Sequence, residues 1–232
     1  KHLFLAEGPQ AVREALDAGL VRTLFVDHTR SAVVDEFGGD DATLVTTRAI
    51  ESLSETEQPQ GVVAVCAMPT TTLDDVLARA PRLLLVCSAV SDPGNIGTIV
   101  RTAHAAGVDA VLCTSGTVEM FNGKVIRSSA GSLFHVPVVQ SLDADDLLAS
   151  LHAAGVASYG LAGSGATSLF DLDDDQLSRP TAWWLGSEAH GLPVSLVRSM
   201  QPVSIPMPGG TESLNVAVAA ALALYASVRA RQ

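Results

Sequence analysis

The sequence predicts an α/β protein in which helices cover both faces of a parallel β-sheet. Short apolar runs alternate with longer segments of helical composition, which is the pattern of consecutive strand–helix units. The run Leu83–Val90 is almost wholly apolar, as expected for a central strand that is buried on both sides. Gly19, Gly107 and Gly155 close predicted helices, and glycine is the residue most often found just past a helix end.

The N-terminal segment is predicted to form a small α/β domain. Its helix begins at Pro9, because proline is favoured in the first turn, and continues to Ala18. Runs at Val21–Val26, Thr43–Thr46 and Gly61–Ala67 are predicted strands.

A turn-rich stretch separates this segment from the rest of the chain. Residues 68–72 read Met-Pro-Thr-Thr-Thr, and a short helix predicted at Leu73–Ala80 runs into Pro81. We therefore predict an N-terminal domain over residues 1–68, a linker over 69–82 and a C-terminal domain over 83–232. The last has about 150 residues, a usual domain size.

The C-terminal domain repeats the order strand, loop, helix. Its predicted strands are Leu83–Val90, Ala110–Cys113, Val156–Ala162, Ala182–Leu185 and Val203–Ile205. Its predicted helices are Ile96–Ala106, Val125–Ser132, Leu142–Ala154 and Ser213–Arg229.

The net charge of −11 and the pI of about 4.8 argue, taken alone, against a nucleic-acid-binding protein. The acidic clusters, however, lie outside the stretch from Leu83 to Gln140. Within it the basic residues Arg101, Lys124 and Arg127 are balanced by an equal number of acids. A neutral patch inside an acidic surface is compatible with one restricted contact to RNA.

Three cysteines, Cys66, Cys87 and Cys113, lie in apolar runs without metal-ligand spacing. They are predicted to be buried, reduced side chains of a cytoplasmic protein. The histidines lack ligand spacing as well, so no metal site is predicted. No apolar run approaches the roughly 18 residues that a membrane-spanning helix needs, so no membrane partner is expected.

Three polar turns marked by glycine interrupt the C-terminal domain. They are Asp92–Gly97, Leu185–Leu192 and Pro206–Glu212, the last of which precedes the pentapeptide Ser-Leu-Asn-Val-Ala at 213–217. Each follows a predicted strand, and ligands of α/β proteins bind at the carboxyl ends of parallel strands. We therefore expect the three turns to form one composite site.

Two polar residues, one in the first turn and one in the helix that follows it, have two equally good interpretations. Asn95 is predicted to cap the helix Ile96–Ala106, and Arg101 lies about one and a half turns further along. They are either a helix cap and a surface arginine, or a functional pair in which a lone guanidinium binds a phosphate or carboxylate. Glu188 is likewise either a loop acid or a charged group at the ligand-binding edge of the sheet.

The three turns resemble the signature motifs of the SpoU (TrmH) family of RNA ribose 2′-O-methyltransferases, in the SPOUT class. Asp92–Ala103 is similar to motif one, Leu185–Leu192 to motif two and Ile205–Ala217 to motif three. Lys124–Ser132 resembles the basic Ser/Gly segment that lies between motifs one and two. Phe4–Gly8 and the helix that follows are similar to the family's substrate-binding domain, which has a ribosomal-protein L30e-like fold.

The resemblance implies a parallel-sheet SPOUT domain with a deep trefoil knot, preceded by a small L30e-like α/β domain. It also implies a homodimer and S-adenosylmethionine as the methyl donor. The catalytic residues that it implies are Arg101, Asn95, Glu188, Asn215 and Ser213. The cofactor-binding residues are Ala162, Gly163, Leu185, Gly186, Ser187, Glu188, Ile205, Met207, Ser213, Leu214 and Val216. The RNA-binding residues are Lys124, Arg127 and Ser129, although ordinary surface charge is an equally good interpretation of Lys124 and Arg127.

The expected function is methylation of a ribose 2′-hydroxyl in RNA. The added N-terminal domain favours 23S rRNA; tRNA is the alternative, and a non-catalytic RNA-binding protein with the same fold is a third reading. The reaction is an in-line displacement that needs alignment and proton removal, not an oxyanion hole or a metal. Because arginine keeps its proton, Arg101 is expected to anchor a phosphate and stabilise charge.

Overall fold

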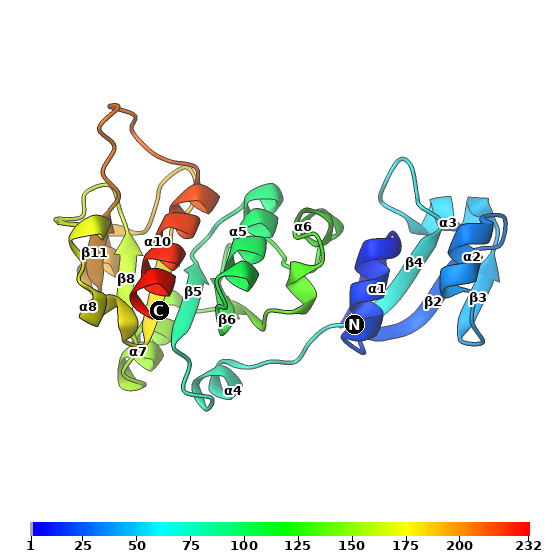
Figure 1. Ribbon diagram of the computed structural model, residues 1–232, viewed down its shortest axis with the longest axis horizontal. Helices are drawn as coiled ribbons and strands as arrows, with labels where there is room; N and C mark the ends of the chain where they lie inside the picture. Colours follow the sequence, from blue (N-terminus) through cyan, green and yellow to red (C-terminus); the bar gives the residue numbers. More distant parts are fainter. Residues whose placement is uncertain (1) are drawn as a thin grey trace.

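The computed structural model describes residues 2–232, whose strands form two sheets (Figure 1). The smaller sheet is built from residues 3–67 and the larger one from residues 83–204. Every strand pair of the larger sheet is parallel. This arrangement confirms the predicted α/β class.

The smaller sheet has the strand order β1-β4-β2-β3. Its segment comprises β1 (Leu3–Glu7), α1 (Pro9–Asp17), β2 (Val21–Asp27), α2 (Ser31–Phe37), β3 (Ala42–Val45), α3 (Thr47–Leu53) and β4 (Val62–Ala67). β4 pairs antiparallel with both β1 and β2, whereas β3 runs parallel to β2. The predicted helix and all three predicted strands are present within a residue or two of their expected bounds.

The two sheets are joined by an extended connection with one short helix, α4 (Leu73–Leu77). Thr72 caps it: the N–H of Asp75 donates to the Thr72 hydroxyl at 3.1 Å, and the Asp75 carboxylate accepts from the Thr72 N–H at 2.9 Å. α4 ends before the predicted Ala80, because Ala80 adopts a φ of 51°, outside the helical region.

The larger sheet has the order β7-β6-β5-β10-β8-β11-β9. Its strands are β5 (Leu83–Cys87), β6 (Ala110–Thr114), β7 (Val138–Leu142), β8 (Ala157–Leu161), β9 (Thr167–Ser168), β10 (Thr181–Leu185) and β11 (Gln201–Ser204). The helices between them are α5 (Pro93–Ala105), α6 (Gly123–Ser128), α7 (Ala144–Ala153), α8 (Asp174–Ser178), α9 (Val194–Arg198) and α10 (Val216–Ala230), with short 3₁₀ turns at Ser132–Phe134 and Leu169–Asp171.

Both faces of the larger sheet are buried, as the apolar character of β5 predicts. Leu85 and Cys87 of β5 belong to a core that includes residues of α5 and α10. Leu84 and Val86 alternate with them and belong to a second core, which includes residues of α7 and α9. The sheet is therefore a layer between two sets of helices.

Two predicted elements of the C-terminal domain are corrected by the structure. The helix predicted at Val125–Ser132 ends at Ser128, because Ala130 and Gly131 have φ values of 48° and 87°. The helix predicted from Leu142 begins two residues later, and the segment before it is strand β7. The polar pair Gln140-Ser141 interrupts the apolar run of β7, and this concealed the strand.

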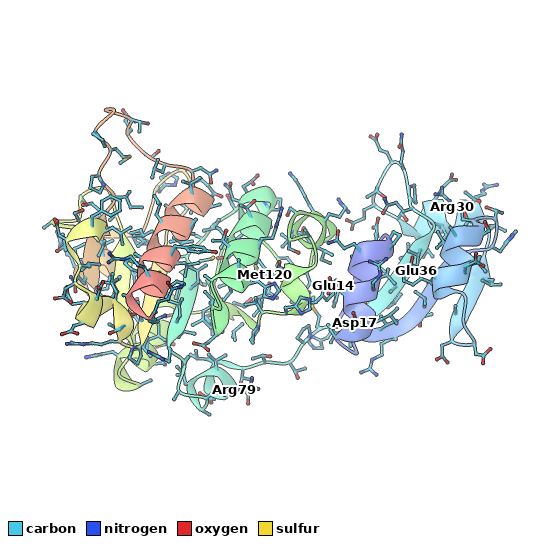
Figure 2. All side chains as sticks on the ribbon, viewed as in Figure 1. Glu14, Asp17, Arg30, Glu36, Arg79 and Met120 are labelled. Atoms are coloured by element: carbon cyan, nitrogen blue, oxygen red, sulfur yellow. The ribbon has the colours of Figure 1, made fainter. Side chains whose placement is uncertain are left out.

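The two sheets and the elements around them share one hydrophobic core. The ring of Phe4 on β1 lies 4.9 Å from that of Phe121 and 6.2 Å from that of Phe134, measured between centroids. On α1, Glu14 faces the C-terminal half of the molecule (Figure 2), where its carboxylate accepts from Nε2 of His135 at 2.7 Å. β1 and α1 are thus held against the rest of the molecule by both apolar and polar contacts.

The apolar segments of the chain are short and pack between layers. Among residues 2–232, no helix has the length and hydropathy that crossing a bilayer demands. Cys66, Cys87 and Cys113 are buried free thiols, as predicted. Burial raises the pKa of the Cys66 thiol to about 11, so it stays protonated at neutral pH.

Candidate active site

The three motif turns follow strands that lie close together in the larger sheet. β10 lies between β5 and β8, and β11 lies on the far side of β8. The loop after β11 extends from the sheet and leads into α10, which packs beside α5 (Figure 1, orange to red). The carboxyl ends of β5, β10 and β11 therefore bring the turns to one edge.

Glu188 connects the turn after β10 with the turn after β5. One carboxylate oxygen, Oε2, accepts from the N–H of Ser91 at 3.1 Å. The other, Oε1, accepts from the N–H of Asp92 at 3.1 Å and from Nδ2 of Asn95 at 3.0 Å. One side chain thus fixes two loops that are far apart in the sequence.

Asn95 and Asn215 extend this network to the start of α10. Nδ2 of Asn215 donates to Oδ1 of Asn95 at 2.9 Å, and Oδ1 of Asn215 accepts from the N–H of Ala217 at 2.9 Å. Asn215 is therefore both the cap of α10 and a bridge to α5. The Asn95 amide is held at both ends, so its orientation is set by Glu188 and Asn215 together.

The helix starts differ from the predicted ones at both asparagines. α5 begins at Pro93, and its cap is Asp92, whose Oδ1 accepts from the N–H of Asn95 at 2.7 Å. Asn95 is thus inside the first turn, where its side chain is free to bind Glu188 and Asn215. α10 begins at Val216, and Ser213 lies in the preceding loop instead of opening the helix.

The same hydrogen bonds keep Glu188 ionised. Partial burial alone would raise the pKa of Glu188, but donors from Asn95, Ser91 and Asp92 outweigh it and lower that pKa to about 2. At neutral pH the edge of the sheet therefore carries a fixed negative charge next to the two asparagines.

Replacing Glu188 by glutamine is expected to flatten the acid dependence of stability. The folded pKa of about 2 lies below the ordinary value of 4.5, so the carboxylate stabilises the fold above about pH 4.5, and this contribution fades as the pH falls toward 2. Because the side chain is largely exposed, we expect about 1 kcal/mol at pH 7. Urea unfolding of both proteins at pH 7, 4 and 3 measures this; a wild-type advantage as large at pH 3 as at pH 7 would contradict it.

Gly186 allows the turn after β10 to close on itself. Ser187 and Gly191 form a short β-bridge, with the N–H of Gly191 donating to the Ser187 carbonyl at 2.8 Å. A Cβ at Gly186 would overlap the backbone of Gly191 and Leu192. The position thus requires glycine for close backbone approach.

The residues implied to bind the cofactor lie along the same edge. Leu185 ends β10, Ala162 and Gly163 directly follow β8, and Ile205 directly follows β11. The N–H of Ala162 donates to the carbonyl of Val203 at 3.0 Å, which joins the β8 and β11 ends. The others lie in the two adjoining turns and at the start of α10; they are Gly186, Ser187, Glu188, Met207, Ser213, Leu214 and Val216.

Arg101 lies outside the hydrogen-bonded network. It is six residues beyond Asn95, which places the two side chains about 120° apart around α5. Arg101 is exposed and forms no hydrogen bond or ion pair with any residue from His2 to Gln232. Its guanidinium is therefore free to bind a ligand. A ligand that contacts only Asn95 and Glu188 would not reach it.

The residues implied to bind RNA differ in their exposure to solvent. Lys124 and Arg127 are exposed on α6. Ser129, in contrast, is fully buried, and its hydroxyl donates to the carbonyl of Ile126 at 2.8 Å. A direct contact between Ser129 and RNA does not fit this geometry; the serine instead closes the end of α6.

Sequence reasoning missed the backbone donors of Ser91 and Asp92. Their N–H groups face Glu188 because Asp92 caps α5 and Pro93 occupies the first helical position. The Asp-Pro dipeptide is a helix-start signal, so the correct start of α5 was within reach of the sequence.

Comparison with known proteins assigns this site to a family. Residues 82–225 match the model of the SpoU rRNA Methylase family, and residues 1–64 match the MRM3-like substrate binding domain. The first match alone covers more than half of the chain. The protein belongs to the SpoU rRNA methylase family. The resemblance of the three motif turns is thereby confirmed.

Relatives of this SpoU family member resemble it over nearly its whole length. The 23S rRNA (guanosine(2553)-2′-O)-methyltransferase RlmP of Bacillus subtilis is 39% identical over 224 residues, which cover 96% of this chain and 87% of the relative. The crystal structure of the SpoU methyltransferase AviRb from Streptomyces viridochromogenes, in complex with AdoMet, has a TM-score of 0.86 at 32% identity and covers 99% of this chain and 91% of that one. This likeness confirms the SPOUT-type fold.

A further solved structure matches only part of this chain. It concerns the 2-OH methylation of C/U34 on tRNA, has a TM-score of 0.59 at 27% identity, and covers 65% of this chain and 97% of that one. That chain is thus matched almost entirely, while about a third of this one has no counterpart in it.

Proposed function

We propose that this SpoU family protein is an S-adenosylmethionine-dependent methyltransferase that methylates a ribose 2′-hydroxyl in 23S rRNA. The Asn95–Glu188–Asn215 network carries the proposal, because it joins all three motif turns at the ligand-binding edge of the sheet. The likeness over almost the whole chain to a 23S rRNA 2′-O-methyltransferase supports the same reaction and substrate class.

The sheet edge fits a donor that has an adenine and a positively charged sulfonium. Backbone groups at the ends of β8, β10 and β11 are suited to the adenine, and Leu214, 36% exposed, offers it an apolar surface. Glu188 supplies negative charge on the same edge. S-adenosylmethionine, when bound there, supplies the methyl group.

The chain's own residues would align and activate the ribose. The 2′-hydroxyl would give its proton to water as its oxygen attacks the donor's methyl carbon in line, and the bond from that carbon to the donor's sulfur would break. The Arg101 guanidinium would bind a phosphate of the target nucleotide and stabilise the charge that develops on the oxygen. Asn95, fixed by Glu188 and Asn215, would position the ribose, and Ser213 would orient the loop before α10.

We further propose a homodimer formed through α10 and the adjacent face of α5. Val218, Leu222 and Tyr225 lie at helical spacing on one side of α10 and are 50%, 37% and 50% exposed. Such a continuous apolar stripe on a helix is typical of an interface between subunits. Arg101 lies on the exposed side of the neighbouring α5, so a dimer would place it at the subunit boundary.

The double variant Val218→Glu/Leu222→Glu is therefore expected to be monomeric. Charges on the stripe would be desolvated in a dimer but stay hydrated in a monomer. Light scattering after size exclusion would show the mass fall from twice the chain's 24.0 kDa to that value. Leu44→Glu, at a 53% exposed residue of β3, is the matched control and should leave the dimer intact. An unchanged mass in the double variant would exclude this interface.

The remaining expectations concern the parts of the chain around the site. We propose that residues 1–68 bind RNA, that 69–82 act as a linker and that 83–232 form the methyltransferase domain. The chain returns from β11 to the middle of the sheet before α10, which supports a deep trefoil knot in this domain. A ribosomal RNA substrate and three reduced cysteines support a cytoplasmic location.

A direct assay tests the function and separates its alternatives. The purified full chain is incubated with tritiated S-adenosylmethionine and either a 23S rRNA or a tRNA transcript, and label in a ribose 2′-O-methyl group is measured. Label in 23S rRNA supports the proposal, whereas label in tRNA alone favours the tRNA enzyme. Calorimetry that detects no S-adenosylmethionine binding would instead indicate a non-catalytic RNA-binding protein.

A further inference from the structure

A cavity of about 310 Å³ lies where the N-terminal domain meets α6. Its walls come from the start of α1, the loop of residues 54–60 before β4, and the end of α6 with the turn that follows. In Figure 1 this is the region between α1 and α6. Ligand pockets of proteins begin at about this volume, and both domains contribute to this one.

The lining of the cavity has an apolar floor and an amide rim. Ala11, Val62 and Ile126 are buried and form part of the floor. Gln58 and Gln60 are exposed on the rim, and neither side chain hydrogen-bonds to any residue of the 2–232 range. An apolar surface with free carboxamides suits a nucleobase, because carboxamides pair with base edges in both grooves and single strands.

Some polar groups of the cavity have no partner among residues 2–232. The hydroxyl oxygen of Ser54 is buried without a hydrogen bond to any described residue. The N-terminus of α1 lacks a side-chain cap, since its cap position is Gly8. The Glu7 carboxylate, in contrast, already accepts from the N–H of Glu55 at 2.8 Å and from the Thr56 hydroxyl at 3.2 Å. A buried hydroxyl without a partner is costly, and a bound base would supply one.

The charge around the cavity suits one phosphate and not a duplex. Arg127 lines the rim, and Lys124 is exposed one turn earlier on the same helix. The Glu55 carboxylate lies near Gly123, beside the Arg127 guanidinium, and offsets part of its charge. A double helix needs a row of cations along its backbone, whereas a single nucleotide needs only one or two.

The cavity is one helix away from the candidate active site. The hydroxyl of Ser128 on α6 donates to the carbonyl of Pro93 at 3.0 Å, in the first turn of α5 that also contains Asn95. Gly97 of α5 faces Ser128 so closely that a Cβ there would overlap its side chain. α6 thus has the cavity on one side and the start of α5 on the other.

We propose that this cavity receives one unpaired base of the RNA substrate, with Gln58 and Gln60 at the base edge and Arg127 at its phosphate. The inference rests on the proposed function, because it names how the same RNA is held outside the methylation site. A base seated here would fix the register of the RNA relative to both domains, which makes the cavity a specificity site.

The test uses the full chain and an in vitro transcript of 23S rRNA. Gln58→Ala/Gln60→Ala is expected to weaken transcript binding about tenfold and to raise KM for RNA with kcat little changed. Arg127→Ala is expected to weaken RNA binding. It should also lower the slope of log affinity against log salt concentration by the amount that corresponds to about one phosphate contact. The matched controls are Gln201→Ala on β11 and the exposed Arg198→Ala on α9, which should bind RNA as the wild type does.

S-adenosylmethionine affinity and thermal melting, measured on each variant, should not change. Transcript binding by Gln58→Ala/Gln60→Ala within twofold of the wild type would overturn the inference and leave the proposed function standing. A wild-type chain that binds S-adenosylmethionine but neither binds nor methylates the transcript would overturn the proposed function, and the inference with it.

Discussion

Arg101→Ala should lower the rate of RNA methylation by at least about 100-fold, the lower range for removing a group that assists proton transfer or stabilises charge. Arg101 has no partner among the described residues and is exposed on α5, so its removal leaves no buried group unpaired. We therefore expect normal folding and S-adenosylmethionine affinity within about twofold of the wild type, because the residue is outside the Asn95–Glu188–Asn215 network. Single-turnover methylation with saturating RNA measures the effect.

Two further variants show whether the guanidinium itself matters. Arg101→Lys keeps the positive charge but loses the bidentate geometry, so partial activity is expected. Arg198→Ala removes an exposed arginine from α9 and should methylate at the wild-type rate. Near-normal methylation by Arg101→Ala would show that Arg101 takes no part in the reaction.

Gly186→Ala should weaken S-adenosylmethionine binding by about 5- to 150-fold, which corresponds to the 1–3 kcal/mol that overpacking costs. The added methyl group would overlap the backbone of Gly191 and Leu192, and backbone cannot rotate aside as a flexible side chain can. The turn must open, which moves Glu188 away from the donors of Ser91 and Asp92. Calorimetric titration with S-adenosylmethionine measures the loss, and methylation should fall with it.

Gly39→Ala is the matched control for this substitution. A Cβ at Gly39 has no atom within 4 Å, and the residue belongs to the N-terminal domain. Its S-adenosylmethionine affinity should equal that of the wild type. If Gly186→Ala bound the cofactor equally well, the turn after β10 would not be part of the cofactor site.

Elements that bury apolar residues can be predicted from the sequence more reliably than short elements at the surface. β5 and β10 are clear because both faces of each strand are buried. α2 and α3 have few buried residues, Phe37 and Ile50 respectively, so no apolar periodicity marks them. The start of α10 was predicted three residues early, because both Ser213 and Asn215 are good capping residues and only the fold selects Asn215.

The candidate site was predictable as a set of residues but not as a network. The motifs indicate Asn95, Glu188 and Asn215, yet only the fold shows that one amide bridges the other two side chains. Nor does a linear pattern reveal that Arg101 is on a different side of α5, since this depends on where the helix begins. The cavity beside α6 could not be predicted from the sequence either, because its walls come from segments that are far apart along the chain.

The aromatic contact of Phe4 with Phe121 and Phe134 limits the modularity of the protein. Recombination that exchanged only the first 68 residues between family members would pair one parent's Phe4 position with the other parent's aromatic partners. A mismatch there leaves a void or a clash in a shared interior. Functional chimeras would therefore need to inherit both sides of that contact from a single parent. Exchanging the first 68 residues alone would not be enough to transfer a new RNA preference.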